Sequence, residues 1–336
     1  MSGKLQQNET AAPLLDIRNL VVHYETDAGV VEAVNDVSLT VEKGESFALV
    51  GETGAGKTTI ALSVMKLLPV PPAHVVDGDI RLQGESIFEK TEKEMRRVRG
   101  STVSMIFQDP MTALNPSARV GEQVAEVIRL HRSCSRTEAM ALAAETLKMV
   151  GIQPERLRDY PHQFSGGMRQ RVVIAIALAC EPELLIADEP TTALDVTIQA
   201  QVLDLIRELR NNLGTAMLLI THDFGVVAEM CDKCAIVYAG QIVEAGTVRQ
   251  IFNNYRHPYT KGLFDSLPSL DKRVRRLKPI KGLMANPMEL PPHCSFSSRC
   301  AYCGEKCLQG DPEPEEVEPG HFVRCYYSSL LGGPEA

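Results

Sequence analysis

The stretch GETGAGKTT, residues 51–59, decides the fold of this chain. It follows the short apolar run SFALV (residues 46–50) and opens a helical pattern that runs from Lys57 to about Leu68. The stretch fits the pattern G-x-x-x-x-G-K-[ST], whose fixed positions are Gly51, Gly56, Lys57 and Thr58. A strand, a glycine-rich loop and a helix in this order predict a site for nucleotide phosphates.

The chemistry of this loop follows from its residue types. Glycines let the backbone curl so that successive N–H groups face phosphate oxygens, and the helix N-terminus adds its dipole. Lys57 can reach the β- and γ-phosphates, and Thr58 can ligate Mg²⁺. A tight turn with a chance lysine is the alternative, which the strand–loop–helix context disfavours. The predicted nucleotide-binding residues are Gly51, Glu52, Thr53, Gly54, Ala55, Gly56, Lys57, Thr58 and Thr59.

A second acidic element, LLIADEP, follows about 130 residues after the loop. Its apolar run predicts a buried strand that ends in Asp188 and Glu189. Taken alone, two solvated acids at a strand end are the more ordinary interpretation. Beside a phosphate loop, Asp188 is expected to hold Mg²⁺ through water, and Glu189 to polarise the attacking water as a base.

Composition limits the class of protein. The 336 residues are 44% hydrophobic and 23% charged, which is typical of a globular protein with two domains or one domain and an appendage. The net charge of -8 disfavours a general nucleic-acid binder. The N-terminus lacks a signal-peptide pattern, and the most apolar run (172–180) is shorter than the ~18 residues of a membrane span. We therefore expect a chain that is neither secreted nor membrane-spanning.

Apolar runs and turn signals alternate along residues 14 to about 255, and this alternation predicts an α/β core with a parallel component. A mainly helical region is expected after Ser117, to about Gly151. Near His257 the composition shifts toward proline, charge and cysteine, so a domain boundary is expected between about 255 and 290. The clearest elements are strands at 14–24, 32–41, 184–188 and 216–223 and a helix at 138–150.

A further motif, SGGMRQR (165–171), resembles the signature of ABC-type ATPases. The order of motifs also resembles that family: the phosphate loop, Gln108 in FQDP, the signature, LLIADEP, ALD (193–195) and His222 in ITHD. The resemblance implies a P-loop NTPase core of the ABC type over residues 14–255. It implies an antiparallel β subdomain, a helical subdomain at about 109–170 and a small cysteine-rich, metal-binding extension at 256–336.

The resemblance also implies roles for single residues. Gln108 would contact Mg²⁺ and the attacking water, and His222 would bind the γ-phosphate and keep Glu189 in register. Tyr24 would stack on adenine, although a tyrosine on a β-surface is nearly as good an interpretation. Asp195 would couple two sites across a dimer interface. The signature residues precede a helix, whose N-terminus favours anions, and would face the ATP of the partner subunit: Ser165, Gly166, Gly167 and Met168.

Three stretches narrow the resemblance to the ATPase subunits of bacterial oligopeptide, dipeptide and nickel importers: FQDPMTALNP (107–116), HPYTKGLFDSLP (257–268) and LPPHCSFSSRC (290–300). This resemblance implies a second ATPase subunit in a heterodimer, two integral-membrane permeases and an extracytoplasmic substrate-binding protein. The chain would lie on the cytoplasmic side of the inner membrane, held by permeases near residues 108–119. Dipeptides or oligopeptides are the expected cargo, and nickel or another small solute stays open. The rival is a soluble ABC ATPase that acts on nucleic-acid or ribosomal complexes.

The nine cysteines fall into two groups. Cys134, Cys180, Cys231 and Cys234 lie in or beside apolar runs, which predicts core packing. The others lie among proline, serine and charge, and a reducing cytosol disfavours disulfides there. Four thiolates can hold a 4Fe–4S cluster or Zn²⁺. The resemblance favours the cluster, zinc ranks second and uncommitted thiols third; Cys303 stays unassigned, and the implied ligands are Cys294, Cys300, Cys307 and Cys325.

Overall fold

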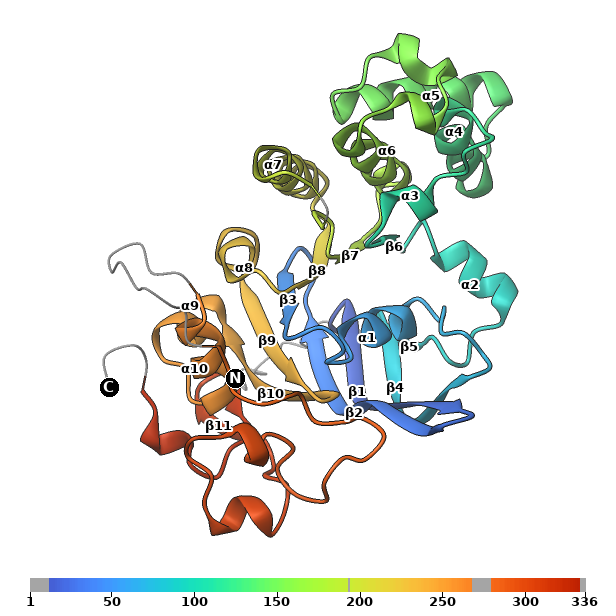
Figure 1. The fold of residues 1–336 in the computed structure, drawn as a ribbon. Helices are drawn as coiled ribbons and strands as arrows, with labels where there is room; N and C mark the ends of the chain where they lie inside the picture. Colours follow the sequence, from blue (N-terminus) through green and yellow to red (C-terminus); the bar gives the residue numbers. More distant parts are fainter. Residues whose placement is uncertain (1–11, 193, 268–278, 333–336) are drawn as a thin grey trace, which may run out of the picture.

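The computed structural model describes residues 12–192, 194–267 and 279–332 (Figure 1). Three sequence-based expectations therefore lie partly outside the described residues. They concern the N-terminal stretch without a signal-peptide pattern (1–11), Ala193 of the ALD motif and Pro268 of HPYTKGLFDSLP.

The centre of the molecule is a sheet of eight strands in the order β11-β12-β10-β9-β3-β8-β7-β6. Strands β9, β3, β8, β7 and β6 run parallel, whereas β10, β12 and β11 continue the sheet with antiparallel pairs. The predicted strands SFALV and LLIAD are buried at every residue, as expected for parallel strands covered on both faces. The strands are β3 (Ser46–Val50), β6 (Val103–Ile106), β7 (Leu184–Asp188), β8 (Ala216–Thr221), β9 (Lys233–Tyr238), β10 (Gln241–Thr247), β11 (Glu315–Glu318) and β12 (His321–Val323).

Four of these parallel strands bring the predicted motifs to one edge of the sheet. The phosphate loop follows β3, Asp188 ends β7, and Gln108 and His222 follow β6 and β8 within two residues. Because β3, β6, β7 and β8 are parallel, their carboxyl ends meet at the same edge, where α/β folds bind ligands.

A second, antiparallel sheet in the order β2-β1-β4-β5 covers α1 (Lys57–Val64). The strands predicted at 14–24 and 32–41 are confirmed as β1 (Leu15–Thr26) and β2 (Gly29–Val41), joined by β4 (Ala73–Leu82) and β5 (Glu85–Ser86). Apolar side chains of this sheet share one core with Ile60 of α1. Helix α1 ends four residues before the predicted Leu68, because Lys66 adopts a left-handed backbone at φ 49°.

A group of helices lies at one end of the molecule, with α4, α5 and α6 side by side (Figure 1). The predicted helical region after Ser117 is confirmed. Helix α5 begins at a capping box in which Ser135 and Glu138 satisfy each other's backbone N–H groups. The remaining helices are α2 (Glu92–Val98), α3 (Pro110–Ala113), α4 (Val120–His131), α5 (Arg136–Met149), α6 (Gly166–Leu178), α7 (Val196–Leu213), α8 (Phe224–Met230), α9 (Val248–Asn253) and α10 (Pro258–Asp265).

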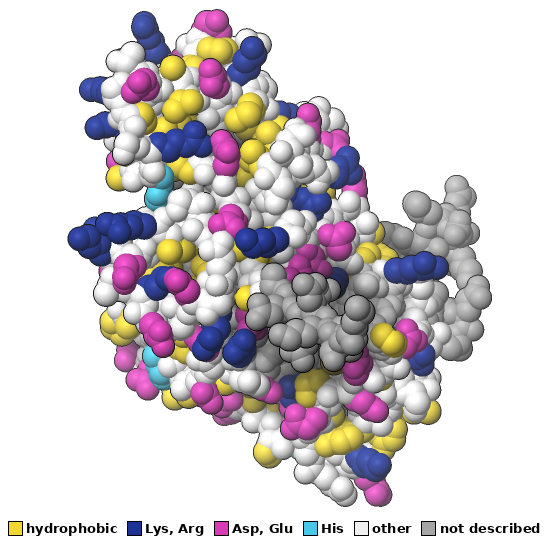
Figure 2. All heavy atoms as spheres, turned by 180° about the vertical axis from the view of Figure 1, so that it is seen from behind, with side chains coloured by type: hydrophobic (Ala, Val, Ile, Leu, Met, Phe, Trp, Pro, Cys, Tyr) yellow, Lys and Arg dark blue, Asp and Glu magenta, His cyan; other side chains and the backbone are white. Residues whose placement is uncertain are grey.

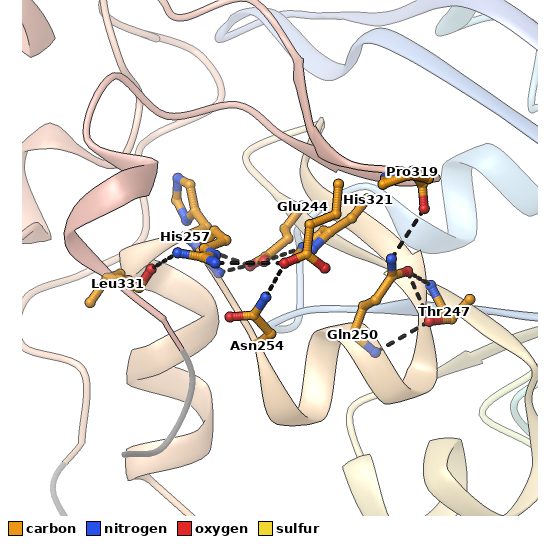
Figure 3. A network of polar contacts seen from close by, with 10 residues as sticks. Glu244, Thr247, Gln250, Asn254, His257, Pro319, His321 and Leu331 are labelled. Atoms are coloured by element: carbon orange, nitrogen blue, oxygen red, sulfur yellow. Dashed lines mark hydrogen bonds and ion pairs between the residues drawn. The ribbon is translucent and has the colours of Figure 1, made fainter. Parts of the chain in front are cut away.

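The C-terminal segment lies at the opposite end and is joined to the main sheet, because β12 pairs with β10. Its short 3₁₀ turns span Ser297–Arg299, Glu305–Leu308 and Ser328–Leu330; two others, Pro154–Arg158 and Pro161–Gln163, precede α6. The buried Glu244 of β10 fastens this junction (Figure 3). Its carboxylate accepts hydrogen bonds from the backbone N–H groups of Arg256 (2.6 Å) and His257 (3.1 Å) and lies 2.9 Å from Nε2 of the buried His321.

The surface carries charges of both signs. Figure 2 shows basic and acidic side chains interspersed over one face of the molecule, in keeping with the modest net charge of -8. Among the helices of the described residues, none combines the length and apolar character that a membrane span requires.

Candidate functional site

The phosphate loop depends on glycine at two positions where the backbone passes very close to other strands. A Cβ atom on Gly51 would lie less than 3.0 Å from the carbonyl oxygen of Val237, and one on Gly56 equally close to that of Ala33. Gly56 also has a φ of 102°, which L side chains rarely adopt. The conformation of the loop therefore requires glycine at both positions, because any side chain there would collide with backbone atoms.

Lys57 is the buried cation of this loop, with only 6% of its surface exposed. Its ammonium group donates hydrogen bonds to the carbonyl oxygens of Gly51 (2.7 Å) and Glu52 (3.0 Å). Burial lowers the pKa of Lys57, while the carboxylates of Glu189 and Asp188 oppose that shift. The positive charge is thus held inside the loop, near Asp188, which ends β7, and Glu189, which follows it.

Asp188 is buried, and burial raises the pKa of its carboxyl group against a hydrogen bond from Thr58. Its Oδ1 has no hydrogen-bond partner within the described part of the chain. A carboxylate oxygen left free beside a threonine hydroxyl is the oxygen-rich arrangement that Mg²⁺ prefers. Two of the three residues predicted to contact Mg²⁺, Thr58 and Asp188, therefore meet.

Glu189 contacts the side chains of two other segments and of Thr192 in its own loop. Its Oε2 accepts hydrogen bonds from Gln108 (3.0 Å) and Thr192 (2.9 Å), and its Oε1 lies 3.3 Å from Nδ1 of His222. Burial alone would raise the pKa of Glu189, but the contacts with Thr192 and His222 lower it overall. The carboxylate is therefore kept ionised, as a base requires.

The backbone of Glu189 is strained, with a φ of 44° that non-glycine residues seldom adopt. Such strain persists only where the surroundings over-determine it, and it is common at active sites. The family resemblance implied that Gln108 and His222 act with Glu189, and in the structure both side chains contact the Glu189 carboxylate. Thr192 was not anticipated, because a threonine three residues after an acid carries no signal of its own.

An open cleft of about 190 Å³ lies between the phosphate loop and Glu189. Tyr24 is not among the lining residues; its hydroxyl lies 3.4 Å from Thr59 Oγ1, so it borders the cleft from β1. Pro287, from the C-terminal segment, was not anticipated from the sequence. The cleft is lined by Val31, Ala33, Thr53, Gly54, Gly56, Lys57, Thr58, Thr59, Gln108, Glu189 and Pro287.

The signature residues begin α6 and lie outside this cleft. Ser165 is the N-cap of α6, and its Oγ accepts a hydrogen bond from the N–H of Met168 (3.4 Å). Asp195 caps α7 in the same way, through the N–H of Ile198 (3.0 Å). Both caps are exposed, so two helix N-termini that favour anions are presented at the surface.

Comparison with known proteins agrees with this geometry. Residues 34–192 match the family described as "ABC transporter", and residues 243–307 match "Oligopeptide/dipeptide transporter, C-terminal region". The probable peptide ABC transporter ATP-binding protein y4tR of Sinorhizobium fredii is 47% identical over 97% of this chain and 98% of its own length. The dipeptide transport ATP-binding protein DppD of Bacillus subtilis is 48% identical over 93% of this chain and 94% of its own.

This chain belongs to the oligopeptide and dipeptide family of ABC transporter ATPases. The fold comparison agrees. The ATP-binding cassette MJ0796, in a dimeric post-hydrolysis state with ADP and Pi, superposes with a TM-score of 0.63 and 25% identity, over 70% of this chain and 99% of that one. The cleft with the phosphate-loop motif therefore belongs to an ABC ATPase fold, and the matched C-terminal region (243–307) covers part of β10 and the first part of the C-terminal segment.

In that extension of the ABC ATPase, four cysteines line one small pocket. We call it the thiol pocket: Cys294, Cys300, Cys307 and Cys325. Burial raises the pKa of Cys294 to about 12 and that of Cys325 to about 11. Cys303 lies outside the lining and is exposed, which separates it from the other four thiols. Within residues 12–192, 194–267 and 279–332, no group of three or more His, Cys, Asp or Glu side chains is arranged to hold a single metal ion.

The cysteines of the ATPase core behave as small apolar residues. Cys234 is buried, and Cys134 and Cys231 pack against apolar core side chains. Burial raises the pKa of Cys231 to about 12, which keeps the thiol protonated. The prediction of core packing is confirmed for these three residues, and Cys180 is half-buried.

Proposed function

We propose that this ABC ATPase is the ATP-hydrolysing subunit of a membrane importer for dipeptides or oligopeptides. The observation that carries the proposal is the extent of the similarity, which includes the C-terminal region named for oligopeptide and dipeptide transport. Relatives named for dipeptide and oligopeptide transport are 48% and 46% identical to this chain over more than nine-tenths of its length.

In the proposed reaction, Glu189 is the base that polarises the water attacking the γ-phosphorus of ATP. Gln108 and His222 act on the same carboxylate, so they orient it and sense whether the γ-phosphate is present. Lys57 and the backbone N–H groups of residues 51–59 bind the phosphates, and Tyr24 stacks on adenine from the neighbouring strand. The lowered pKa of Glu189 supports its assignment as the base.

Asp188, Thr58 and Gln108 are the proposed ligands of Mg²⁺. The free, buried Oδ1 of Asp188 and its hydrogen bond with Thr58 support this assignment. When bound, Mg²⁺ would neutralise charge on the β- and γ-phosphates. Asp188 would hold the ion through water, and Glu189 would remain available to the attacking water.

The signature residues Ser165, Gly166, Gly167 and Met168 are proposed to contact the ATP of a second ATPase subunit, and Asp195 to couple the two sites. The exposure of Ser165, Gly166 and Asp195 outside the chain's own cleft supports this assignment. The assembly would contain a heterodimer of ATPases, two integral-membrane permeases and an extracytoplasmic binding protein. This chain would then be peripheral, on the cytoplasmic side of the inner membrane, held by the permeases near residues 108–119.

We also propose that the thiol pocket holds a 4Fe–4S cluster. A cluster keeps its four thiolates further apart than one ion does, because the iron and sulfide atoms occupy the space between them. The four cysteines that line one pocket support this proposal, since four thiolates are the ligand set of a 4Fe–4S cluster and of a structural zinc site. The cluster would serve as a structural staple for a segment with little core.

Transport is tested by co-expressing the chain with two permeases, a second ATPase subunit and a binding protein of a peptide importer from the same genome, and reconstituting the complex in proteoliposomes. Peptide with the binding protein should stimulate ATP hydrolysis and peptide uptake. If a nickel complex stimulates hydrolysis and peptide does not, the proposed cargo is wrong and nickel takes its place. Stimulation of the purified chain by RNA or ribosomes, with no permease association, would favour the rival soluble ATPase.

The cluster is tested by anaerobic purification followed by iron and sulfide analysis and visible absorption, which colourless zinc lacks. Cys303→Ser should retain iron, whereas Cys307→Ser should lose it. Protein without iron would refute the cluster, and loss of iron in Cys303→Ser would refute the assigned ligands.

A further inference from the structure

The C-terminal extension reaches into the phosphate loop through one ion pair. The guanidinium of Arg299 donates two hydrogen bonds to the carboxylate of Glu52, at 2.7 and 3.0 Å. The Arg299 side chain is 4% exposed and that of Glu52 33%. A bidentate pair with one partner buried fixes both distance and orientation, so Glu52 is held in one position.

Glu52 is fixed at its other polar groups as well. Its backbone N–H donates to the hydroxyl of Tyr259 (3.0 Å), and its carbonyl oxygen accepts from the ammonium of Lys57 (3.0 Å). Tyr259 belongs to α10, outside the ATPase core motifs. Glu52 is therefore bound to α10 and to Lys57 through its backbone, and to Arg299 through its side chain.

Arg299 is itself firmly held. Its Nε donates to the carbonyl of Lys281 (3.1 Å), and its guanidinium lies over the rings of Tyr238 (5.7 Å) and Phe296 (5.9 Å). Cation–π contacts of this kind stabilise a guanidinium that has little access to water. Lys281 begins a stretch that leads to Pro287, which lines the ATP cleft. Arg299 thus touches the loop and anchors a second segment that forms part of the cleft wall.

The turn that carries Arg299 lies between two cysteines of the thiol pocket. The 3₁₀ turn Ser297–Arg299 is closed by hydrogen bonds from the N–H of Ser297 to the carbonyl of Cys294 (3.0 Å) and from the N–H of Cys300 to the carbonyl of Ser297 (3.3 Å). Any change in how these two thiols are held must act on this turn.

We propose that Arg299 is a positioning residue of the ATP site, which holds Glu52 and the phosphate loop in the conformation that binds ATP and transmits the state of the thiol pocket to that loop. It touches neither substrate nor reacting atoms and acts through Glu52. Its loss should weaken ATP binding and leave the chemical step intact.

The test measures the Kd of a fluorescent ATP analogue, and kcat and KM for hydrolysis, on the full chain. Arg299→Ala should raise Kd and KM by about tenfold, with kcat within about twofold, because bound ATP can still order the loop. Arg299→Lys, which keeps the charge but not the bidentate fork, should lie between wild type and Arg299→Ala. A lower kcat at unchanged KM would overturn the proposal.

The matched control is Arg324→Ala. Arg324 is equally buried and fastens the extension to Asp36 (3.0 Å) and Asp311 (3.3 Å), away from the loop. Both alanine variants should lower Tm, but only Arg299→Ala should raise Kd. Equal Kd values in the two variants would show that Arg299 contributes to stability but does not position the ATP site. If Arg299→Ala does not fold, Arg299→Lys and Glu52→Gln decide the same question.

A double-mutant cycle tests the route. If Arg299 acts through Glu52, Arg299→Ala should add no further rise in Kd to a Glu52→Ala protein. Additive effects would contradict the proposal that Arg299 acts through Glu52.

The Cys300→Ser variant, measured for ATP binding, tests the link between the thiol pocket and the phosphate loop. The Kd for ATP should rise as the turn loosens, and an unchanged Kd would contradict that link.

Discussion

Gln108 and His222 contact different oxygens of one carboxylate, that of Glu189. The first residue follows β6 and the second follows β8, so two strands on either side of β7 fix the acid that β7 delivers. The contacts from both sides and the strained backbone therefore fix the position of the Glu189 carboxylate before ATP binds.

Replacing Glu189 with Gln should abolish ATP turnover while preserving ATP binding. The amide keeps the size of the side chain but cannot accept a proton, and general-base catalysis typically contributes about 10²–10⁴-fold. Phosphate release and the Kd of a fluorescent ATP analogue measure the two properties separately. Turnover at the wild-type rate would disprove the role of Glu189.

Gly56→Ala should destabilise the protein by about 1–3 kcal/mol beyond the cost of a left-handed alanine, because the new methyl group collides with the carbonyl oxygen of Ala33. Gly214→Ala is the matched control: it also has a positive φ (67°), but a Cβ there meets nothing within 4 Å. That control should cost only roughly 1 kcal/mol. Urea unfolding of both variants makes the comparison, and equal losses would show that the close approach at Gly56 is relieved by movement.

Glu244→Ala should lower the free energy of unfolding by about 3 kcal/mol or more. It leaves the N–H groups of Arg256 and His257, and Nε2 of His321, without their acceptor in a buried site, and each unsatisfied group costs about 1–3 kcal/mol. Glu318→Ala serves as the control, because it removes a partly exposed carboxylate that pairs with Arg256 in the same network. Its effect should stay within about 1 kcal/mol. Similar losses in the two variants would contradict the role given to Glu244.

Cys303 should be the first thiol to react with an alkylating reagent under native conditions. It is the one exposed cysteine among the nine, all of which lie in the described residues. Burial raises the pKa of Cys231 and of Cys294 to about 12, so their reactive thiolates are rare at neutral pH. Brief labelling followed by peptide mass mapping measures the order. Labelling of Cys294 before Cys303 would mean that the thiol pocket opens readily in solution.

The phosphate site could be predicted from sequence because its determinants are local. A strand, a glycine-rich loop and a lysine succeed one another within about fifteen residues, and the physics of the turn needs those residue types. The convergence on Glu189 was predicted less directly. Gln108 and His222 carry no signal alone, and only the order of motifs indicated that parallel strands would bring them together.

Other parts of the site could not be predicted in this way. Arg299 and Glu52 are 247 residues apart, and neither residue type is unusual at its position. Pro287 reaches the cleft because a non-regular segment passes over β2, where its carbonyl accepts a hydrogen bond from the N–H of Glu32 (2.8 Å). Contacts that depend on the path of a coil segment leave no periodic pattern in the sequence. The end of α1 was missed for a related reason, since a left-handed lysine has no compositional mark.

The pairing of β12 with β10 has a consequence for how the protein is made. Strand β10 ends at Thr247, and its partner begins at His321, so a ribosome must add roughly seventy further residues before the edge of the main sheet can close. During those seconds β10 offers unpaired N–H and C=O groups to any neighbouring chain, a known route to aggregation. A chaperone that shields β10 until β12 has been made should therefore raise the yield of soluble protein.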